Sequence, residues 1–101
     1  MSKPFTNPQL RKLKALAQRL DPVLHIGKEG VSEGFLRSAD AELVRHELVK
    51  IKLVALKDEK RTVAPLVAEK TGSHLVAQVG HVFVLYRPNE DPALRKIALE
   101  D

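Results

Sequence analysis

A helix with one apolar and one basic side is predicted near the N-terminus. Apolar residues recur there three and four positions apart, as one face of a helix requires. They are Leu10, Leu13, Leu16, Ala17 and Leu20. The opposite side is polar and basic, and consists of Arg11, Lys12, Lys14, Gln18 and Arg19. Asn7-Pro8 is a typical helix start and Asp21-Pro22 a typical stop, so we expect this helix to bury one face and expose a basic one.

A short strand and a second helix are predicted next, with a glycine-containing turn between them. The apolar run at 23–26 predicts the strand, and Gly27-Lys28-Glu29-Gly30 ends it. Ser32 can cap the first turn of the helix, and Val31 can pack on Leu36 as a hydrophobic staple. The helix should run to about His46, and its apolar face consists of Phe35, Leu36, Ala39, Leu43 and Val44.

The segment 48–56 is rich in branched apolar residues and predicts a second strand. A third helix is expected over about 58–71, with Gly72 as its C-terminal stop. Pro65 falls inside that range, and a proline removes a helical hydrogen bond. The third helix therefore either starts late, near Thr62, or bends.

Two final strands, over 74–79 and 82–87, are predicted to form a hairpin around Gly80-His81. The element order is then α-β-α-β-α-β-β. Such an order predicts an α/β fold: a single compact domain with a four-stranded mixed sheet and helices packed on it. We expect this domain to cover 1–90, followed by a C-terminal tail over 91–101 with one or two loose helical turns.

The excess of positive charge is confined to the first third of the chain. The whole chain carries 17 Lys and Arg residues against 13 Asp and Glu, a net charge of +4. Residues 1–30 account for all of the excess, with six basic and two acidic side chains. Clustered charge of this kind indicates a polyanionic partner, although a solvated basic helix face would give the same pattern.

Composition excludes several functional classes. The chain has no cysteine, which rules out disulfides, thiolate nucleophiles and cysteine-ligated zinc. No apolar stretch approaches the ~20 residues that span a bilayer, and the first residues lack the apolar segment of a secretory signal. We therefore expect a cytoplasmic protein with no membrane partner, and a monomer is the simplest oligomeric state.

Gly27-Lys28-Glu29-Gly30 is the segment with the clearest candidate chemistry. Glycine removes the side chain that would hold a polymer away from the backbone. The helix that follows directs unpaired amides and a partial positive charge toward the tetrad, which favours an anion, and Lys28 adds a full charge. KH domains clamp an RNA backbone with such a Gly-x-x-Gly loop. A turn that simply needs glycine is the alternative, and the spacing fits neither a P-loop nor a dinucleotide fingerprint.

Four stretches of sequence occur in an order and at a spacing that are specific. They are LRKLKALA at 10–17, PVLHIGKEGVSEG at 22–34, HELVKIK at 46–52 and VGHVFVLYR at 79–87. Together they resemble the CRM-domain family, most closely its free-standing bacterial, YhbY-type form. The resemblance implies a fold like the C-terminal domain of bacterial translation initiation factor three, related to KH domains. On this pattern Gly27 and Gly30 are the loop glycines that contact RNA, and Lys28 is the base of the loop.

The resemblance also implies a partner. Bacterial members of the family associate with precursors of the large ribosomal subunit, and plant relatives act in organelle intron splicing. We therefore expect an RNA-binding protein, not an enzyme, that contacts ribosomal RNA during assembly of the large subunit. Two residues depart from the family pattern. Glu29 places a carboxylate in the loop, where it could repel a phosphate or cap a nearby amide, and Pro65 interrupts a helix.

The candidate RNA contacts fall into three groups. The loop supplies Gly27, Lys28, Glu29 and Gly30. The first helix supplies Arg11, Lys12, Lys14 and Arg19. The strands add His25, Lys50, Lys52, Tyr86 and Arg87. Lys50 and Lys52 share one face because side chains alternate along a strand, and Tyr86 is the best candidate to stack on a base, whereas Phe35 and Phe83 look like core. We expect the cations of the helix and loop to lie on or near one surface.

Metal binding, catalysis and protein docking are the alternatives. The four histidines lack a metal-ligand spacing, so no metal or cofactor is expected. A ribonuclease would need His25, Lys28 and Glu29 to converge, which nothing in the sequence requires. His25 itself could contact a nucleotide or be an ordinary sheet residue. The competing function is a protein-interaction module whose basic helix docks on an acidic partner.

Overall fold

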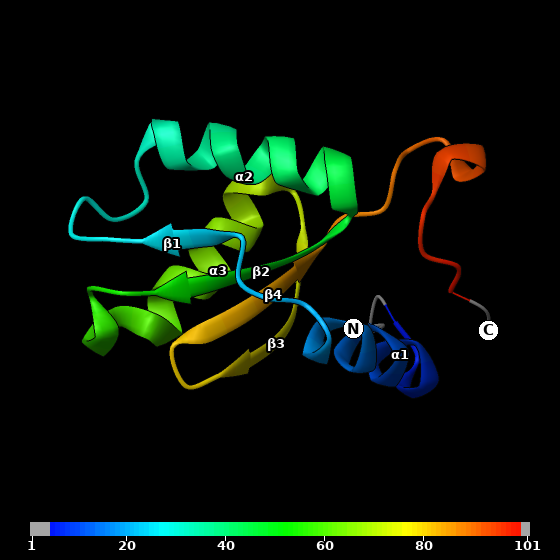
Figure 1. Cartoon of the computed structure of the whole chain (residues 1–101), viewed down its shortest axis with the longest axis horizontal. Coiled ribbons are helices and arrows are strands. Elements are labelled where there is room, and N and C mark those ends of the chain that lie inside the picture. The colour runs from blue at the N-terminus through cyan, green and yellow to red at the C-terminus, as the bar shows by residue number, and fades with distance from the viewer. Residues whose placement is uncertain (1–4, 100–101) are drawn as a thin grey trace.

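Figure 1 shows the computed structural model, in which residues 5–99 are described. The first helix, α1 (Asn7–Gln18), begins after Thr6 rather than after Asn7. The Thr6 hydroxyl accepts from the Gln9 amide, and the Gln9 side chain accepts from the Thr6 amide. This reciprocal capping box satisfies two donors at once, which is why the helix starts one residue earlier than Asn7-Pro8 predicts.

The remaining elements follow the predicted order. They are β1 (Leu24–Ile26), α2 (Glu33–His46), β2 (Leu48–Leu53), the 3-10 turn η1 (Lys57–Glu59), α3 (Lys60–Thr71), β3 (His74–Val79), β4 (Val82–Tyr86) and the 3-10 turn η2 (Pro92–Leu94). The predicted α-β-α-β-α-β-β order is thereby confirmed. The tail forms only one short turn, η2, within its described part.

The four strands form one mixed sheet, as predicted. Its strand order is β1-β2-β4-β3. β1 and β2 are parallel and are joined by α2, whereas β2 pairs with β4 and β4 with β3 in antiparallel fashion. The β3–β4 hairpin turns at Gly80, which has a φ of +58°, so the predicted hairpin is confirmed.

The bounds of β2 and α3 differ from the predicted ones, and β1 and β4 are each one residue shorter than predicted. β2 ends at Leu53 instead of reaching 56, because the Val54 and Ala55 amides turn to the Ile26 carbonyl and Leu56 adopts a left-handed φ of +56°. α3 starts at Lys60, between the expected start at about 58 and the late start near Thr62, and continues through Pro65, which is exposed. It stops at Gly72 with a φ of +64°, as predicted.

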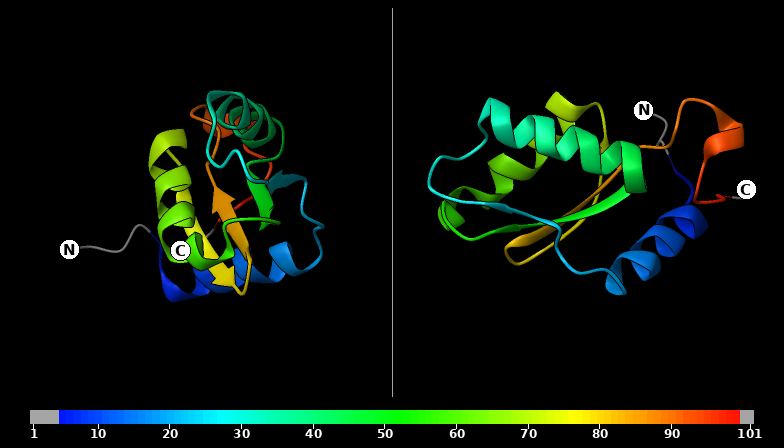
Figure 2. Two further views of the ribbon diagram at one scale, coloured as in Figure 1. Left: turned by 90° about the vertical axis from the view of Figure 1, so that its left-hand side faces the viewer. Right: turned by 45° about the horizontal axis from the view of Figure 1, so that its top comes forward.

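Each face of the sheet has its own apolar core. α2 and α3 lie together on one face, and α1 lies alone on the other (Figures 1 and 2). The core under α2 and α3 includes Ile26, Leu43, Val49, Ile51, Leu53, Val67, Phe83 and Leu85. The core under α1 includes Leu13, Ala17, Leu48, Val76, Val84 and Tyr86. Alternation along β2 and β4 sends neighbouring residues into different cores.

The predicted apolar face of α2 is right for Ala39 and Leu43, which are buried, but wrong for Val44. Val44 is 61% exposed, since it lies on the side of α2 that faces away from the sheet.

Within residues 5–99, no helix is both long and apolar enough to cross a membrane.

Candidate functional site

The loop 27–30 joins the end of β1 to the start of α2, at one end of the long axis of the molecule (Figure 1). It is a tight turn in which the Gly30 amide donates to the Gly27 carbonyl at 3.0 Å. The Ser32 hydroxyl accepts from the Phe35 amide at 3.1 Å, so the predicted cap of α2 is confirmed. The loop is therefore held by its own backbone and by a regular helix start.

The two glycines of the loop have different reasons for being glycine. Gly30 has a φ of +70°, and a Cβ there would lie 3.3 Å from the Leu56 Cδ1 atom. Both observations disfavour any other residue at position 30. At Gly27, by contrast, φ is not in the left-handed region and an added Cβ would meet no described atom within 4 Å. The turn explains the glycine at 30 but not the glycine at 27.

The two charged residues of the loop are exposed and unpaired. Neither Lys28 nor Glu29 forms a hydrogen bond or ion pair with another residue of the described chain. Glu29 thus caps no amide within residues 5–99, and its carboxylate is left in solvent beside Lys28. A second carboxylate, Glu33, lies in the first turn of α2, where it faces the positive end of the helix dipole.

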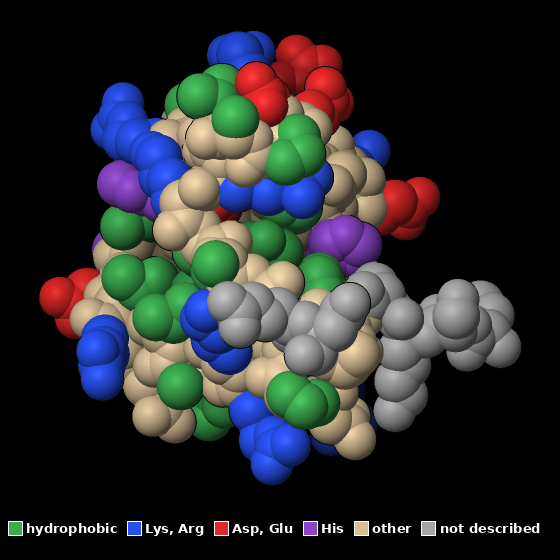
Figure 3. Space-filling model, turned by 90° about the vertical axis from the view of Figure 1, so that its right-hand side faces the viewer, with side chains coloured by type: hydrophobic (Ala, Val, Ile, Leu, Met, Phe, Trp, Pro, Cys, Tyr) green, Lys and Arg blue, Asp and Glu red, His purple; other side chains and the backbone are tan. Residues whose placement is uncertain are grey.

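The basic side of α1 is exposed as predicted, at Arg11, Lys12, Lys14 and Arg19. Lys12 is partly engaged, because its Nζ atom donates to the Ala98 carbonyl of the tail. At the end of the molecule that carries α1 and the tail, Lys and Arg side chains are spread among hydrophobic ones rather than gathered in one patch (Figure 3). The loop lies toward the opposite end (Figure 1), so the cations expected on one surface occupy two regions.

Three of the strand candidates, His25, Lys50 and Lys52, lie between these two regions, on the α1 side of the sheet. His25 pairs with Lys52 across the parallel strands, and both are exposed. Lys50 lies two residues before Lys52 on the same face, as predicted, but its Nζ atom donates to the Ala17 and Leu20 carbonyls at 3.2 Å each. Lys50 therefore satisfies the C-terminal end of α1, whereas the side chains of His25 and Lys52 form no hydrogen bond or ion pair within the described chain.

Tyr86 is predicted to stack on RNA bases, and the structure overturns this prediction. The residue is only 2% exposed and belongs to the core under α1, with the Phe5 ring centroid 5.6 Å away. Burial, together with the Glu47 carboxylate and partly offset by Arg95, raises the pKa of the Tyr86 hydroxyl above its ordinary value of about 10. The ring supports the docking of α1 and is not available to a base.

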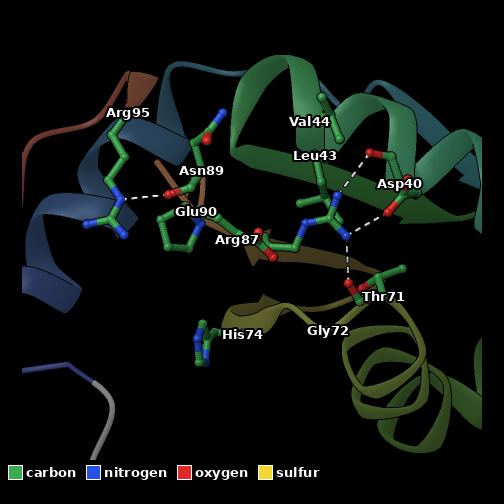
Figure 4. Close-up of a pocket in the computed structure, with 11 residues that line it drawn as sticks. Asp40, Leu43, Val44, Thr71, Gly72, His74, Arg87, Asn89, Glu90 and Arg95 are labelled. Carbon is green, nitrogen blue, oxygen red and sulfur yellow. Dashed lines mark hydrogen bonds and ion pairs between the residues drawn. The ribbon is translucent and has the colours of Figure 1, made fainter. Parts of the chain in front are cut away.

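Arg87 is predicted as an RNA contact, but its guanidinium is used inside the protein. Nη1 donates to Asp40 Oδ1 and to the Thr71 carbonyl, both at 2.7 Å, and Nη2 donates to the Asp40 carbonyl at 3.2 Å. Figure 4 shows these bonds tying the end of β4 to α2 and α3, beside a hollow of about 770 Å³. The side chain therefore joins three elements of the fold instead of being free for a ligand.

Glu47, which the sequence gives little reason to single out, organises the same end of the molecule. It is 1% exposed and has a φ of +64°, which is unusual for a residue other than glycine. Its carboxylate accepts from the Asn89 and Lys96 amides at 2.6 Å and from the Ile97 amide at 3.1 Å. The sequence gives one sign of this role: an acidic residue lies directly between a helix and a buried strand.

The histidines do not gather into a metal site. Within residues 5–99, no group of three or more His, Asp or Glu side chains is arranged to hold a metal ion. His74 instead packs edge-on against Phe5, with ring centroids 4.9 Å apart.

The described core, loop and strand order have counterparts in known proteins. The model of the CRS1/YhbY (CRM) domain matches residues 5–87. This chain belongs to the CRM-domain family. The matched part of the CRM domain includes α1, the loop 27–30 and all four strands. The family resemblance of the sequence is thereby confirmed.

Relatives of this CRM domain cover nearly its whole length. An RNA-binding protein of Haemophilus influenzae is 35% identical over 92 residues, covering 90% of this chain and 93% of the relative. A Pseudomonas aeruginosa protein named as a probable RNA-binding protein is 33% identical over 89 residues, covering 87% and 86%. The solution structure of a Staphylococcus aureus protein, described as a candidate RNA-binding protein, superimposes with a TM-score of 0.75 at 32% identity, covering 93% of this chain and 99% of that one.

Proposed function

We propose that this CRM domain binds RNA without catalysing a reaction, and that it contacts the phosphate backbone through the loop 27–30 and the basic side of α1. Its relatives in Haemophilus influenzae and Pseudomonas aeruginosa are named as RNA-binding proteins. Residues 1–30, which include this helix and loop, account for the whole net charge of +4. Both features support a polyanionic partner.

The observation that carries the proposal is the space at Gly27. A Cβ there would touch no described atom within 4 Å, and the backbone does not need glycine. Space next to the backbone lets a polymer approach its amides closely. The first amides of α2, at Glu33 and Gly34, have no partner within the helix, and the unpaired Lys28 lies in the loop that leads into this helix. A phosphate oxygen is the ligand that such donors fit.

We further propose that the RNA is ribosomal and that the protein, as a cytoplasmic monomer, acts during assembly of the large ribosomal subunit. This part rests on the likeness of PVLHIGKEGVSEG and the flanking segments to bacterial CRM proteins. Few aromatic side chains are exposed in the described chain, since Phe83 and Tyr86 are buried. Recognition of the backbone is therefore favoured over stacking on bases.

The loop is tested by comparing variants on one labelled fragment of large-subunit ribosomal RNA at fixed salt. Gly30→Asp should weaken binding most, because it adds a carboxylate to the loop that is proposed to hold the phosphate. Lys28→Glu should weaken it less, and Lys28→Ala least. Gly30→Ala is the matched control: it carries the same backbone strain, about 1 kcal/mol, without the charge. Gly27→Ala should keep the stability of the parent and still lower its affinity.

Two outcomes would contradict the proposal. If folded Gly30→Asp and Gly27→Ala bind RNA as the parent does, the loop is only a turn.

The dependence of RNA affinity on salt is the second test. If about four phosphates are neutralised, log affinity should fall against log salt with a slope of roughly −3 to −4. A slope near zero for the parent would instead favour docking of α1 on an acidic protein.

A further inference from the structure

One row of residues crosses all four strands on the face where α1 lies, but beyond the reach of that helix. The strand register places His25 of β1, Lys52 of β2, Val82 of β4 and Val79 of β3 side by side. Neighbouring strands are about 4.8 Å apart, so the row spans roughly 14 Å. We call these four residues the open row.

The open row is exposed although half of it is apolar. His25 and Lys52 are exposed, Val82 is half-buried, and Val79 is 78% exposed, the highest value among the exposed large apolar residues of the described chain. The neighbouring residues on the same face, Lys50 of β2 and Val84 of β4, are instead covered by α1 or bonded to it. α1 thus covers one part of the face and leaves the open row to solvent.

A groove continues from the open row to α1. It has a volume of about 430 Å³ and lies between Lys14 and Gln18 of α1 and Val79, Val82 and Ala77 of the hairpin. No acidic residue lines this groove. The strands Leu24–Ile26, Leu48–Leu53, His74–Val79 and Val82–Tyr86 contain two lysines and no Asp or Glu at all.

Apart from Lys50, which is bonded to the end of α1, the lysines that border this surface are not used by the protein. Lys14, Lys28 and Lys52 are exposed and form no hydrogen bond or ion pair with another described residue. In the chain the acids nearest to the surface are Asp21, at the end of α1, and Glu29 in the loop. The face is therefore a positive strip with an apolar middle, running from the loop to α1.

We propose that an RNA strand lies across the open row, with its phosphates on Lys28, Lys52 and Lys14 and its sugars and bases against Val82 and Val79. This inference rests on the proposed RNA binding and adds the path that the RNA takes between the two contact regions. The row contains no Phe, Tyr or Trp, and its one aromatic ring is the imidazole of His25, so the contact should carry little sequence preference.

Charge complementarity favours RNA over other occupants of this surface. A second copy of the chain would set the same lysines against one another. An acidic protein would find three separate lysines without the ordered array of hydrogen-bond donors that fixes a protein interface. A nucleic acid backbone offers an evenly charged line that matches cations spaced along a strip.

The test uses two matched pairs of variants on a labelled hairpin of large-subunit ribosomal RNA. Lys52→Ala is compared with Lys70→Ala, since Lys70 is an exposed lysine of α3, on the other face of the sheet. Val79→Asp is compared with Val44→Asp, since Val44 is exposed on α2. Lys52→Ala should reduce the slope of log affinity against log salt by about one. Val79→Asp should weaken binding on the order of tenfold, because it sets a carboxylate against a polyanion.

The outcomes separate this inference from the proposed function. Weaker binding by Lys52→Ala and Val79→Asp but not by their controls would support the path. If the Lys28 and Gly30 variants lose affinity while these two bind as the parent does, the protein binds RNA but not across the open row, and the inference fails. If Val79→Asp changes the sedimentation behaviour of the protein and not its RNA affinity, the row is a contact between copies, and the inference fails as well.

Discussion

The two ends of the molecule use charged side chains in opposite ways. At the end that carries the loop, Lys28, Glu29 and Lys52 are exposed and have no partner in the described chain. At the other end, Arg87 and Glu47 each form three hydrogen bonds within the protein. In the sequence the two sets look alike. What separates them is whether the fold supplies partners, and only the unpartnered set is free to bind a ligand.

The end that carries Arg87 and Glu47 is called the bonded end here. The hydrogen bonds of Glu47 follow from the high free energy of burying a charge. A carboxylate removed from water is strongly unfavourable unless donors surround it. Glu47 is supplied with three backbone amides from the segment 89–97, and this requirement draws the tail onto the domain. Ile97 and Leu99 then pack against the core under α1. The C-terminal tail predicted over 91–101 is therefore held on the domain, in its described part, by one buried acid and by this apolar contact.

The largest effect is expected at Glu47. Glu47→Ala removes the acceptor of three amides and should lower the free energy of unfolding by about 2–3 kcal/mol. Glu47→Gly loses the same carboxylate but accepts the positive φ, so it should be less destabilising than alanine by about 1 kcal/mol. Urea unfolding of both variants measures this difference. Equal stability of the two would show that the backbone at position 47 is not strained.

A smaller and reciprocal effect is expected for Arg87 and Lys28. Arg87→Gln should lower the free energy of unfolding by about 1–2 kcal/mol, because Asp40 and the Thr71 carbonyl lose their donor, and should leave RNA affinity unchanged. Lys28→Gln should do the reverse, with unchanged stability and weaker RNA binding. Unfolding and RNA titration of both variants test the comparison between the ends. A loss of RNA affinity in folded Arg87→Gln would mean that the bonded end also contacts RNA.

The smallest effect concerns the pH dependence of stability at Tyr86. Its pKa is raised in the folded state, so the unfolded chain loses the phenol proton first as the pH rises. Stability is thus fully present below about pH 10 and falls as the pH rises above it. Tyr86→Phe has no such proton. The difference in unfolding free energy between the parent and Tyr86→Phe should be constant below about pH 10. Above that pH the parent should lose stability relative to Tyr86→Phe. A difference that stays constant at all pH values would contradict the raised pKa.

The local elements could be predicted from the sequence because their signals are local. Ser32 caps α2 and Gly72 ends α3 through contacts within a few residues. Gly27-Lys28-Glu29-Gly30 lies where a strand passes into a helix, and the order of elements follows from the spacing of apolar residues. The exposure of the basic side of α1 is another property of one helix alone.

Segments distant in the sequence decide whether Lys50, Tyr86 and Glu47 are buried or hydrogen-bonded. Lys50 and Lys52 are chemically identical and share one strand face, yet only Lys50 meets the carbonyls of α1. Tyr86 is buried because α1 docks on the face it occupies, and Glu47 is satisfied by amides more than forty residues further along the chain. Local periodicity thus determined which elements form. Tertiary packing decided which charges and rings remain free, because a side chain finds its partners only when distant segments meet.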